Sequence, residues 1–594
     1  MSGFGGVINK HTPIPAAVME KMQESLKSLG TDNCGTYISQ NVCLIHTGYN
    51  FENSRQPVRG VLGRTAYFVV LDGELYNKTE LRRELITLGY RTHDDSDANV
   101  VLHGYMAWGK NCVERFIGAY AFAVWDETGL FIARDRLGIK PLYFSENSDG
   151  LVFASSLQAV LSHPNIQPQI DENGILELIM LGPARSPGCA IFANVKEIAP
   201  GECAYYTTLS PGLEINTYWR LKAKIHQDNY PQTVEHVRQL VTDSVNRHGV
   251  PQGSTGVSLV SGGLDSSIIT ALSGIKESYD LDYVGNNKHF AANNFQPQED
   301  RDFVEIIKNY LGLNYRRIIL GSDEIAGALH PAMVARGLPG MADIDAALLL
   351  FLQKIGEFHD GFFAFSGEGA DEIFGGYPWC NANTAPTTFP WATDINLRAS
   401  FLPDFPICPK EYVKSRFNRA IASANTLYDD DDIEKQTRQM FNINLGWFMQ
   451  NLTNRASAMG TAAKVRMRMP FLDYHLVEYM YNVPSEFLTR DGTKGLLRTA
   501  FKDILPLEII EREKSPFPKT HNPGYTKLVQ DKLRMILADS NAPIFSILHK
   551  NVLENILENE SGHWYGQLMA YPQTIAYFLQ INDWMKFFNV VVNV

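Results

Sequence analysis

The chain has 594 residues, a net charge of −12 and a pI of about 5.7, so it lacks the basic field of a general nucleic-acid-binding protein. Hydrophobic residues make up 45% and charged residues 20%, as in soluble globular proteins, and the length predicts several domains or two large ones. The sequence predicts no membrane span, because no stretch approaches about 18 apolar residues. The seven cysteines are scattered without a C-x-x-C spacing, which favours a reducing cytoplasm over a disulfide framework or a zinc site.

The first part of the chain, residues 1–210, has the pattern of a layered sheet structure. Short runs of β-branched and aromatic residues predict strands, and amphipathic patches between them predict helices. The strands are expected at 67–71 and 119–125, and the helices at 78–88 and 98–109. A turn-rich stretch at 208–216 predicts a linker over 211–230, which leaves 231–594 as the second domain.

The sequence of the second domain predicts strands that alternate with helices. A strand at 255–260 leads into a Ser-Gly-Gly loop and then a helix from Ser266. Longer helices are expected at 302–310, 346–356 and 438–459. Alternating strands and helices are typical of a parallel α/β sheet.

The loop after the first of these strands has the pattern of an anion site. Gly262 and Gly263 let the backbone approach an anion closely, and the following helix presents free N–H groups to it. Hydroxyl donors are available from Ser261, Ser266 and Ser267. Asp265 would repel a bare phosphate, so its position indicates a Mg²⁺ between the two. The alternative is a Gly-Gly turn capped by serines, with no ligand.

A second loop, residues 366–377, follows a buried strand expected at 362–365. Asp371 is a candidate second Mg²⁺ ligand, and Glu368 could orient or deprotonate an incoming amine. Two lysines further along, Lys494 and Lys514, are suited to stabilise charge on an acyl-adenylate or on pyrophosphate. Read alone, the loop could be a solvated acidic turn, and each lysine a surface charge.

Four motifs occur in one order: SGGLDSS at 261–267, SGEGADEIFGGY at 366–377, MPFLD at 469–473 and TKGLLR at 493–498. Upstream, GELYN at 73–77, Ser96-Asp97 and ARDRLGIKPLY at 133–143 accompany them. Together these motifs resemble the glutamine-hydrolysing asparagine synthetase superfamily over nearly the whole chain.

The resemblance implies a mixed α/β and α+β protein. Its N-terminal domain would be a layered αββα glutaminase of the N-terminal-nucleophile type. Its C-terminal domain would be an ATP-pyrophosphatase of the adenine nucleotide α-hydrolase type, with a parallel sheet and extra helices. The implied cofactors are ATP and Mg²⁺, the substrate is an amino-acid-like carboxylic acid, and a homodimer is usual.

The resemblance also assigns site residues. Asp265 and Asp371 match the Mg²⁺ ligands, and Glu368 and Lys494 match residues near the reacting centre. The nucleotide-binding positions are Leu259, Ser261, Gly262, Gly263, Asp265, Ser266, Ser267, Val284, Ser366 and Gly367.

The glutaminase half departs from the family pattern. Ser2 stands where the family has its cysteine nucleophile, and Asp72 where it has an oxyanion-hole asparagine. An ionised carboxylate would repel a developing oxyanion, and losing one such donor costs about 10²–10³-fold in rate. The arginine that clamps the glutamine carboxylate is absent from 43–50. Gly73, Glu74 and Asp97 remain as a vestigial site, so we expect this domain to be inactive.

A domain kept without its chemistry suggests that glutamine is not the nitrogen source, as in β-lactam synthetases and lasso-peptide cyclases. The first hypothesis is therefore a ligase that joins an intramolecular amine, as in antibiotic biosynthesis. The alternative is an asparagine synthetase that uses free ammonia, or residual glutamine, to amidate aspartate, and the third hypothesis is a catalytically dead binding protein. The stretch 337–345 also departs from the family, which predicts a changed acceptor pocket. Because no tyrosine lies between 316 and 376, we expect no Tyr–Glu pair of the β-lactam synthetase kind.

Overall fold

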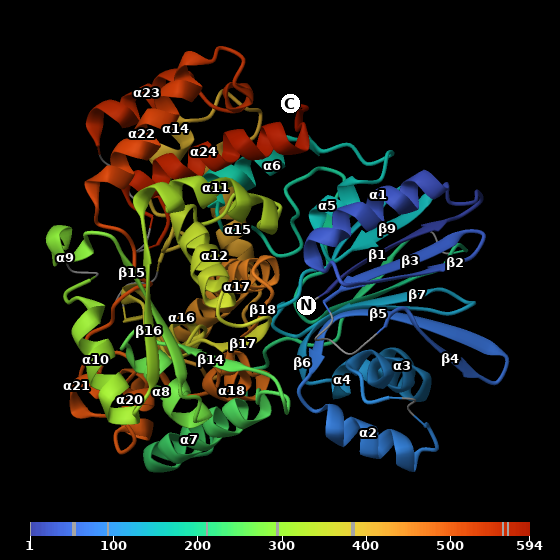
Figure 1. Cartoon of the computed structure of the whole chain (residues 1–594), viewed down its shortest axis with the longest axis horizontal. Helices are drawn as coiled ribbons and strands as arrows, with labels where there is room; N and C mark the ends of the chain where they lie inside the picture. The colour runs from blue at the N-terminus through green and yellow to red at the C-terminus, as the bar shows by residue number, and fades with distance from the viewer. Residues whose placement is uncertain are drawn as a thin grey trace. The chain divides into compact units, whose positions relative to one another are not determined.

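The computed structural model describes residues 2–49, 55–91, 94–209, 212–292, 296–381, 386–560, 564–566 and 569–594. It divides into two compact units, which are described separately. Unit 1 comprises Met1–Gly174, Ser186–Arg220 and Asn589–Asn593, and is drawn mainly in blue and cyan in Figure 1. Unit 2 comprises Ile175–Arg185 and Leu221–Phe588.

Unit 1 contains two six-stranded sheets. The first has the order β11-β8-β9-β1-β3-β2 and the second the order β13-β12-β7-β6-β5-β4. The strands of the first are β1 (Ser2–Asn9), β2 (Asn33–Ile38), β3 (Val42–Gly48), β8 (Tyr143–Glu146), β9 (Gly150–Ala154) and β11 (Lys196–Glu197). The strands of the second are β4 (Val58–Leu62), β5 (Thr65–Leu75), β6 (Gly118–Trp125), β7 (Leu130–Arg134), β12 (Glu202–Tyr206) and β13 (Glu214–Thr217).

Side-chain alternation explains how these sheets stack. Along β6, Ala121 and Ala123 join the core that contains Phe4 of β1, so the two sheets face each other. The intervening Tyr120 and Phe122 point the other way, into a core shared with the helices of that side. The helices are α1 (Ala16–Leu26) and α5 (Leu157–Leu161) beside the first sheet, and α2 (Lys78–Thr87), α3 (Asp97–Trp108) and α4 (Cys112–Arg115) beside the second. The predicted αββα layering is confirmed.

The borders between the units are more complex than one linker. The predicted linker, 211–230, contains β13, and its last residue, Tyr230, is the first of α7. Helix α6 (Glu172–Leu176) leads into residues 175–185, which pack in unit 2, where Tyr412 Oη donates to Glu177 Oε1 at 2.8 Å. Near the C-terminus, β19 (Val591–Val592) pairs in parallel with β10 (Gln169–Ile170) of unit 1.

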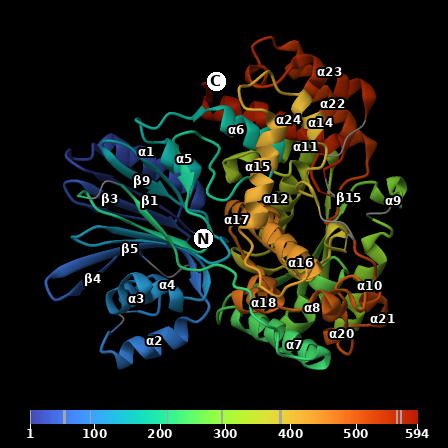
Figure 2. The same cartoon turned by 180° about the vertical axis from the view of Figure 1, so that it is seen from behind.

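Unit 2 is built on a five-stranded parallel sheet of order β16-β15-β14-β17-β18, as predicted. The strands are β14 (Gly256–Leu259), β15 (Glu277–Tyr283), β16 (Asn314–Leu320), β17 (Phe362–Phe365) and β18 (Val465–Arg468). All four residues of β17 are buried, as expected for a parallel sheet covered on both faces. The helices α11, α12 and α17 pack against one another, and α17 also contacts β18 (Figure 2).

The helices of unit 2 account for most of its remaining length. They are α7 (Tyr230–Arg247), α8 (Leu264–Ser273), α9 (Asn286–His289), α10 (Asp300–Leu311), α11 (Ser322–Arg336), α12 (Asp343–Gly356), α13 (Ala370–Ile373), α14 (Ile395–Ser400), α15 (Pro409–Ala422), α16 (Asp432–Ile443), α17 (Met449–Ala462), α18 (Tyr474–Met480), α19 (Ser485–Thr489), α20 (Gly495–Phe501), α21 (Leu507–Ile510), α22 (Pro523–Ala538), α23 (Lys550–Asn559) and α24 (Tyr571–Phe588). The predicted helix 438–459 is interrupted by a π-helical turn at Asn444–Phe448.

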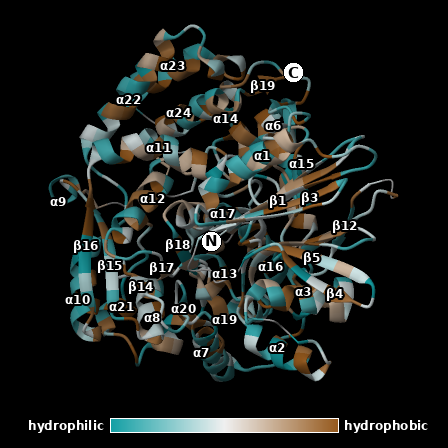
Figure 3. Cartoon of the chain, turned by 45° about the vertical axis from the view of Figure 1, so that its right-hand side comes forward, coloured by the Kyte–Doolittle hydropathy of each residue, from teal (hydrophilic) through white to brown (hydrophobic). Residues whose placement is uncertain are grey.

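Surface helices show the expected amphipathic pattern. Helix α7 buries Val237, Val241 and Val245, at a spacing that places them on one face, and it carries hydrophilic and hydrophobic colours together in Figure 3. Among the described residues, no helix is both long and apolar enough to cross a lipid bilayer.

Candidate active site

The two predicted loops line one cavity of about 210 Å³ in unit 2. They follow β14 and β17, which are neighbours in the parallel sheet, so their carboxyl ends meet at one edge. Ligands of open α/β sheets bind outside this edge. The predicted residues that line the cavity are Leu259, Ser261, Gly263, Asp265, Ser266, Ser366, Gly367, Glu368, Asp371 and Lys514.

Four predicted residues do not line the cavity, and they differ in where they lie. Gly262 belongs to the same loop, Ser267 is fully buried behind it, and Lys494 contacts the two cavity aspartates. Val284 follows β15 and is 54% exposed, so the structure does not bring it to the cavity. The residues of β15 that line the cavity are Tyr279 to Leu281 instead.

The first loop needs its glycine. Gly262 has a φ of 67°, and a Cβ there would lie 2.7 Å from the Phe303 backbone of α10. Ser261 Oγ and Ser266 Oγ are 3.0 Å apart, which holds the turn closed. The N-cap of α8 is Gly263, which supplies no side-chain cap. The loop therefore leaves the positive end of the helix open to an anion.

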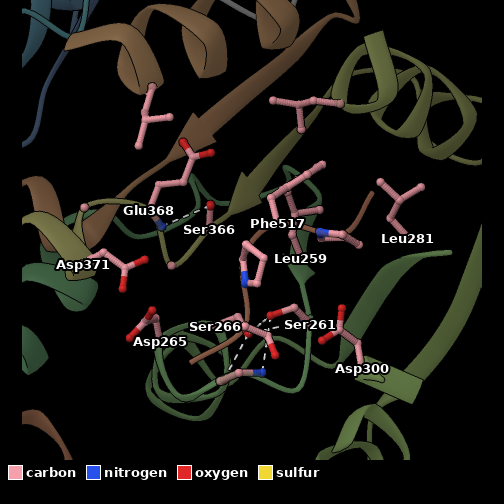
Figure 4. A pocket seen from close by; sticks show the side chains of 18 of the residues that line it. Leu259, Ser261, Asp265, Ser266, Leu281, Asp300, Ser366, Glu368, Asp371 and Phe517 are labelled. Atoms are coloured by element: carbon pink, nitrogen blue, oxygen red, sulfur yellow. Dashed lines mark hydrogen bonds between the residues drawn. The ribbon is translucent and has the colours of Figure 1, made fainter. Parts of the chain in front are cut away.

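The second loop packs directly on the first. A Cβ on Gly367 would lie 2.7 Å from Ser266 N, so only glycine permits this approach. Asp265 and Asp371 consequently face each other in the pocket, while the Glu368 carboxylate points away from them (Figure 4).

Two lysines neutralise the two aspartates. Lys494 Nζ lies 2.5 Å from Asp265 Oδ2 and also contacts Asp371 Oδ1, and Lys514 Nζ contacts Asp371 Oδ2. Burial raises the pKa of Asp265. Burial acts in the same direction on Asp371, but the two ammonium groups outweigh it and hold its pKa at about 2. Burial works to lower the pKa of Lys494, yet the carboxylates raise it to about 12.

These aspartates fit a Mg²⁺ that arrives with a nucleotide. Asp265 Oδ1 is buried and has no hydrogen-bond partner among the described residues. In the part of the chain that the structure describes, no group of three or more acidic, histidine or cysteine side chains could hold a metal alone. Mg²⁺ is commonly held by one or two carboxylates, with phosphate oxygens and water completing its shell.

Sequence reasoning missed the partner of Glu368. Its Oε1 accepts a hydrogen bond from Nη2 of Arg455, a residue of α17 whose side chain is 3% exposed and lines the cavity. Burial acts to lower the pKa of Arg455, but Glu368 and Asp345 outweigh it and raise the pKa. The Arg455 guanidinium also lies 5.2 Å from the centre of the Phe517 ring.

A Tyr–Glu pair does occur in the cavity, although no tyrosine lies in the range 316–376. Tyr377, one residue beyond that range, donates from Oη to Glu372 Oε1 at 2.5 Å. Burial, reinforced by the charge of Asp371, raises the pKa of Glu372 to about 7. Tyr377 also packs edge to face on Phe448, which stacks on Tyr565, so this wall of the cavity is aromatic.

In unit 1, two residues of the expected vestigial site, Ser2 and Asp72, are in contact. Ser2 is buried, and its Oγ lies 3.2 Å from Asp72 Oδ1. Lys140 Nζ is 3.0 Å from the same oxygen, so Asp72 acts as an acceptor. Asp97 Oδ1 accepts from Leu75 N at 2.8 Å.

The other two residues of the expected vestigial site, and the stretch that lacks the arginine, lie as follows in unit 1. Gly73 has a φ of 125°, and a Cβ there would meet Ala119 O at 2.0 Å. Glu74 lies on β5 beside it. In the stretch 43–50, residues 43–48 belong to β3, and residue 50 lies outside the described residues.

Comparisons with known proteins agree with the family resemblance of both the N-terminal and the C-terminal part of the chain. The profile of the asparagine synthase family matches residues 236–586, and that of the glutamine amidotransferase domain matches residues 1–219. Asparagine synthetase [glutamine-hydrolyzing] 3 of Bacillus subtilis is 36% identical over 597 residues, covering 97% of this chain and 96% of that protein. Asparagine synthetase [glutamine-hydrolyzing] 1 of the same species is 27% identical, covering 94% and 93%.

Among solved structures, the glutamine phosphoribosylpyrophosphate amidotransferase of B. subtilis matches with a TM-score of 0.30 and 14% identity. That match covers 54% of this chain and 81% of that chain. The family profiles and the relatives at full length are decisive. The chain therefore belongs to the asparagine synthase family of ATP-dependent carbon–nitrogen ligases.

Proposed function

We propose that the chain is an AMP-forming amide synthetase that adenylates a carboxylate and takes its nitrogen from an amine directly, without hydrolysing glutamine. The observation that carries the proposal is the joint placement of Asp265, Asp371, Lys494 and Lys514 beside the open N-terminus of α8. This set suits a bound triphosphate whose pyrophosphate must leave.

In the first step, the acceptor carboxylate attacks the α-phosphorus of ATP and pyrophosphate departs. The backbone N–H groups of α8, with Ser261 and Ser266, bind the phosphates. Asp265 and Asp371 would hold a Mg²⁺, which neutralises phosphate charge when bound. Lys494 and Lys514 stabilise the negative charge that gathers on the leaving group.

In the second step, an amine attacks the acyl carbon and AMP leaves. The amine must be neutral to attack, so a proton has to be accepted in the cavity. Glu372 is matched to this task near neutral pH, because its pKa is about 7. Glu368 pairs with Arg455 and is suited to bind an amino group.

The unit 1 site supports a nitrogen source other than glutamine. A glutaminase needs donors aimed at the developing oxyanion, and Asp72 instead accepts hydrogen bonds at that position. Ser2 is also a weaker nucleophile than cysteine at neutral pH.

Two amine sources are supported by different observations. Free ammonia attacking activated aspartate is favoured by the relatives, which are named asparagine synthetases. An amine of the substrate itself is favoured by the aromatic wall of Tyr377, Phe448 and Tyr565, which suits an acceptor with an apolar body.

The experiment is pyrophosphate release from ATP and Mg²⁺ with a panel of amino-bearing dicarboxylic acids, with ammonium, glutamine or neither, followed by mass measurement of the products. Release with aspartate and ammonium, giving asparagine, supports the first source. Release without ammonium, giving a product one water lighter than its substrate, supports the second. Glutamine-dependent release equal to that with ammonium would contradict the proposal.

A further inference from the structure

Residues 512–522 form a strap along the wall of the cavity, without regular secondary structure. The strap joins α21 to α22, and its residues Lys514 to Pro518 line the cavity, where Figure 4 labels Phe517. Among the described residues, no backbone–backbone hydrogen bond reaches residues 512–521. Ordering an irregular segment costs conformational entropy, so side chains of other segments must fix the strap.

The first end of the strap is held by Arg512, which is 4% exposed. Its Nη1 donates to Ser261 O of the first loop at 2.9 Å, and its Nη2 contacts the carboxylate of Asp300 in α10. The guanidinium also lies 4.1 Å from the centre of the Phe303 ring. This end of the strap is therefore fixed to the loop that is expected to bind the nucleotide.

The second end of the strap is held by Asn286, the first residue of α9. Its Nδ2 donates to Lys519 O at 3.0 Å, and its Oδ1 accepts from His521 N at 2.8 Å. A side-chain amide is suited to this role because it carries both a donor and an acceptor, as a neighbouring strand would. Tyr283 Oη adds a hydrogen bond to Pro518 O at 2.8 Å.

Lys514 lies between these two ends, two residues after Arg512 and five before Lys519. Its ammonium group contacts Asp371, but its side chain is 21% exposed, and a partly exposed ion pair contributes little by itself. The position of the ammonium group therefore depends on both ends of the strap. Among the described residues, Asn286 is not one that lines the cavity, so it can affect the reaction only through the strap.

We infer that Asn286 is a positioning residue, which binds the strap at Lys519 and His521 and thereby keeps the Lys514 ammonium group beside Asp371. The inference rests on the proposed function, in which Lys514 stabilises the charge that gathers on pyrophosphate as it leaves. Because this charge develops in the transition state, loosening the strap should lower kcat and leave the binding of Mg·ATP nearly unchanged.

The first measurement is limited digestion of the full chain with trypsin, with the cleavage sites identified by mass spectrometry. The strap contains three sites for trypsin, after Arg512, Lys514 and Lys519. Because Asn286→Ala loses two hydrogen bonds to the strap, cleavage after Lys514 and Lys519 should be about tenfold faster than in the wild type. An unchanged cleavage rate would overturn the inference, whether or not the chain has the proposed function.

The second measurement is ATP–pyrophosphate exchange with aspartate, in a double-mutant cycle of Asn286→Ala and Lys514→Met. We expect the kcat of Asn286→Ala to fall about tenfold, with the Kd for Mg·ATP within about twofold of wild type. In the Lys514→Met background, Asn286→Ala should lower kcat no further, because Asn286 acts through this lysine. An equal loss in both backgrounds would overturn the inference and leave the proposed function intact.

Asn442→Ala is the matched control. Asn442 is also half-buried, and its Nδ2 donates to Ser423 Oγ at 3.0 Å, but it lies in α16 and does not line the cavity. Its cleavage and exchange rates should match those of the wild type. If the wild type binds Mg·ATP but shows no exchange with aspartate or any other acid of the panel, the proposed function fails. The cleavage rates alone then decide whether Asn286 holds the strap.

Discussion

Lys494 Nζ lies 2.5 Å from Asp265 Oδ2 and also contacts the carboxylate of Asp371, so one ammonium group joins the loops that follow β14 and β17. The Lys494 side chain is 4% exposed. A buried charge that is left without its partner costs free energy, so we expect this lysine to stabilise the folded protein as well as to act on the substrate.

Replacing Lys494 with methionine should therefore lower both activity and stability. Two buried carboxylates would face each other with only Lys514 remaining, and breaking a buried pair in this way costs about 3–5 kcal/mol. We expect the free energy of unfolding of Lys494→Met to fall by an amount of this order, with loss of ATP–pyrophosphate exchange. Chemical denaturation followed by circular dichroism would measure the first effect.

The control for this variant is Lys354→Met. Lys354 pairs with Glu324 at 2.7 Å, but both side chains are substantially exposed, so the expected change is below about 1 kcal/mol. Adding Asp371→Asn to Lys494→Met should recover stability without recovering exchange. Unfolding of Lys494→Met at the wild-type midpoint would contradict the role assigned to the cluster.

Gly367→Ala should weaken nucleotide binding. Its Cβ would lie 2.7 Å from Ser266 N and 2.9 Å from Asp265 C, so the second loop would have to move off α8. We expect the Kd for Mg·ATP, measured by equilibrium dialysis, to rise at least about tenfold.

Gly327→Ala is the comparison, because this glycine lies in α11 and a Cβ there meets nothing within 4 Å. Its Kd should be unchanged, and it should stabilise the protein by about 1 kcal/mol, since alanine favours helix. Equal affinities for Gly367→Ala and wild type would show that the loop contact does not matter for binding.

Glutamine hydrolysis should be absent in the wild type and should need two substitutions to appear. Glutamate release by wild type is expected to equal that of Ser2→Ala. Ser2→Cys alone should remain at this level, because Asp72 Oδ1 lies beside the side chain and carries negative charge where an oxyanion would form.

Ser2→Cys/Asp72→Asn should exceed Ser2→Cys, by at most about 10²–10³-fold for one restored donor. Glutamate release by wild type above that of Ser2→Ala would disprove the loss of this activity.

Sequence patterns located the elements that are stabilised locally. The strand predicted at 362–365 has the same bounds as β17. The helix predicted at 346–356 is α12, which begins three residues earlier, at Asp343. The glycines and hydroxyls of the two loops predict an anion site, because such a loop is specified by adjacent residues, and the binding of an anion there stays a prediction. Asp265 and Asp371 could be brought together in prediction because parallel strands end at one edge.

Side chains that meet across long distances in the sequence could not be predicted in this way. Arg455 lies on a helix 87 residues after Glu368, and nothing in its own neighbourhood distinguishes it from a surface arginine. Tyr377 lies one residue beyond 316–376, the range in which the absence of tyrosine argues against a Tyr–Glu pair. The resemblance places Val284 at the nucleotide, but this residue follows the end of β15 and is exposed. The pairing of β19 with β10 joins the C-terminal end to unit 1, which no pattern of the two short strands indicates.

The last prediction concerns the pH dependence of stability. An unfolded glutamate has a pKa of about 4.3. Burial, with the charge of Asp371, raises the pKa of folded Glu372 to about 7, so the folded state binds this proton more tightly. The contribution of Glu372 to stability is thus fully present below about pH 4 and is lost as the pH rises through about 7.

Removing the Glu372 carboxyl group should make the free energy of unfolding depend less on pH. Between pH 4.5 and pH 7.5 we expect the wild type to lose on the order of 3 kcal/mol relative to Glu372→Gln, as measured by chemical denaturation at each pH. Tyr377→Phe removes a hydrogen-bond donor that favours the ionised form of Glu372. The loss of stability with rising pH should therefore occur at higher pH in this variant than in the wild type. Parallel curves for wild type and Glu372→Gln would mean that Glu372 does not titrate in this range, and the proton acceptor of the second step would then have to be another group.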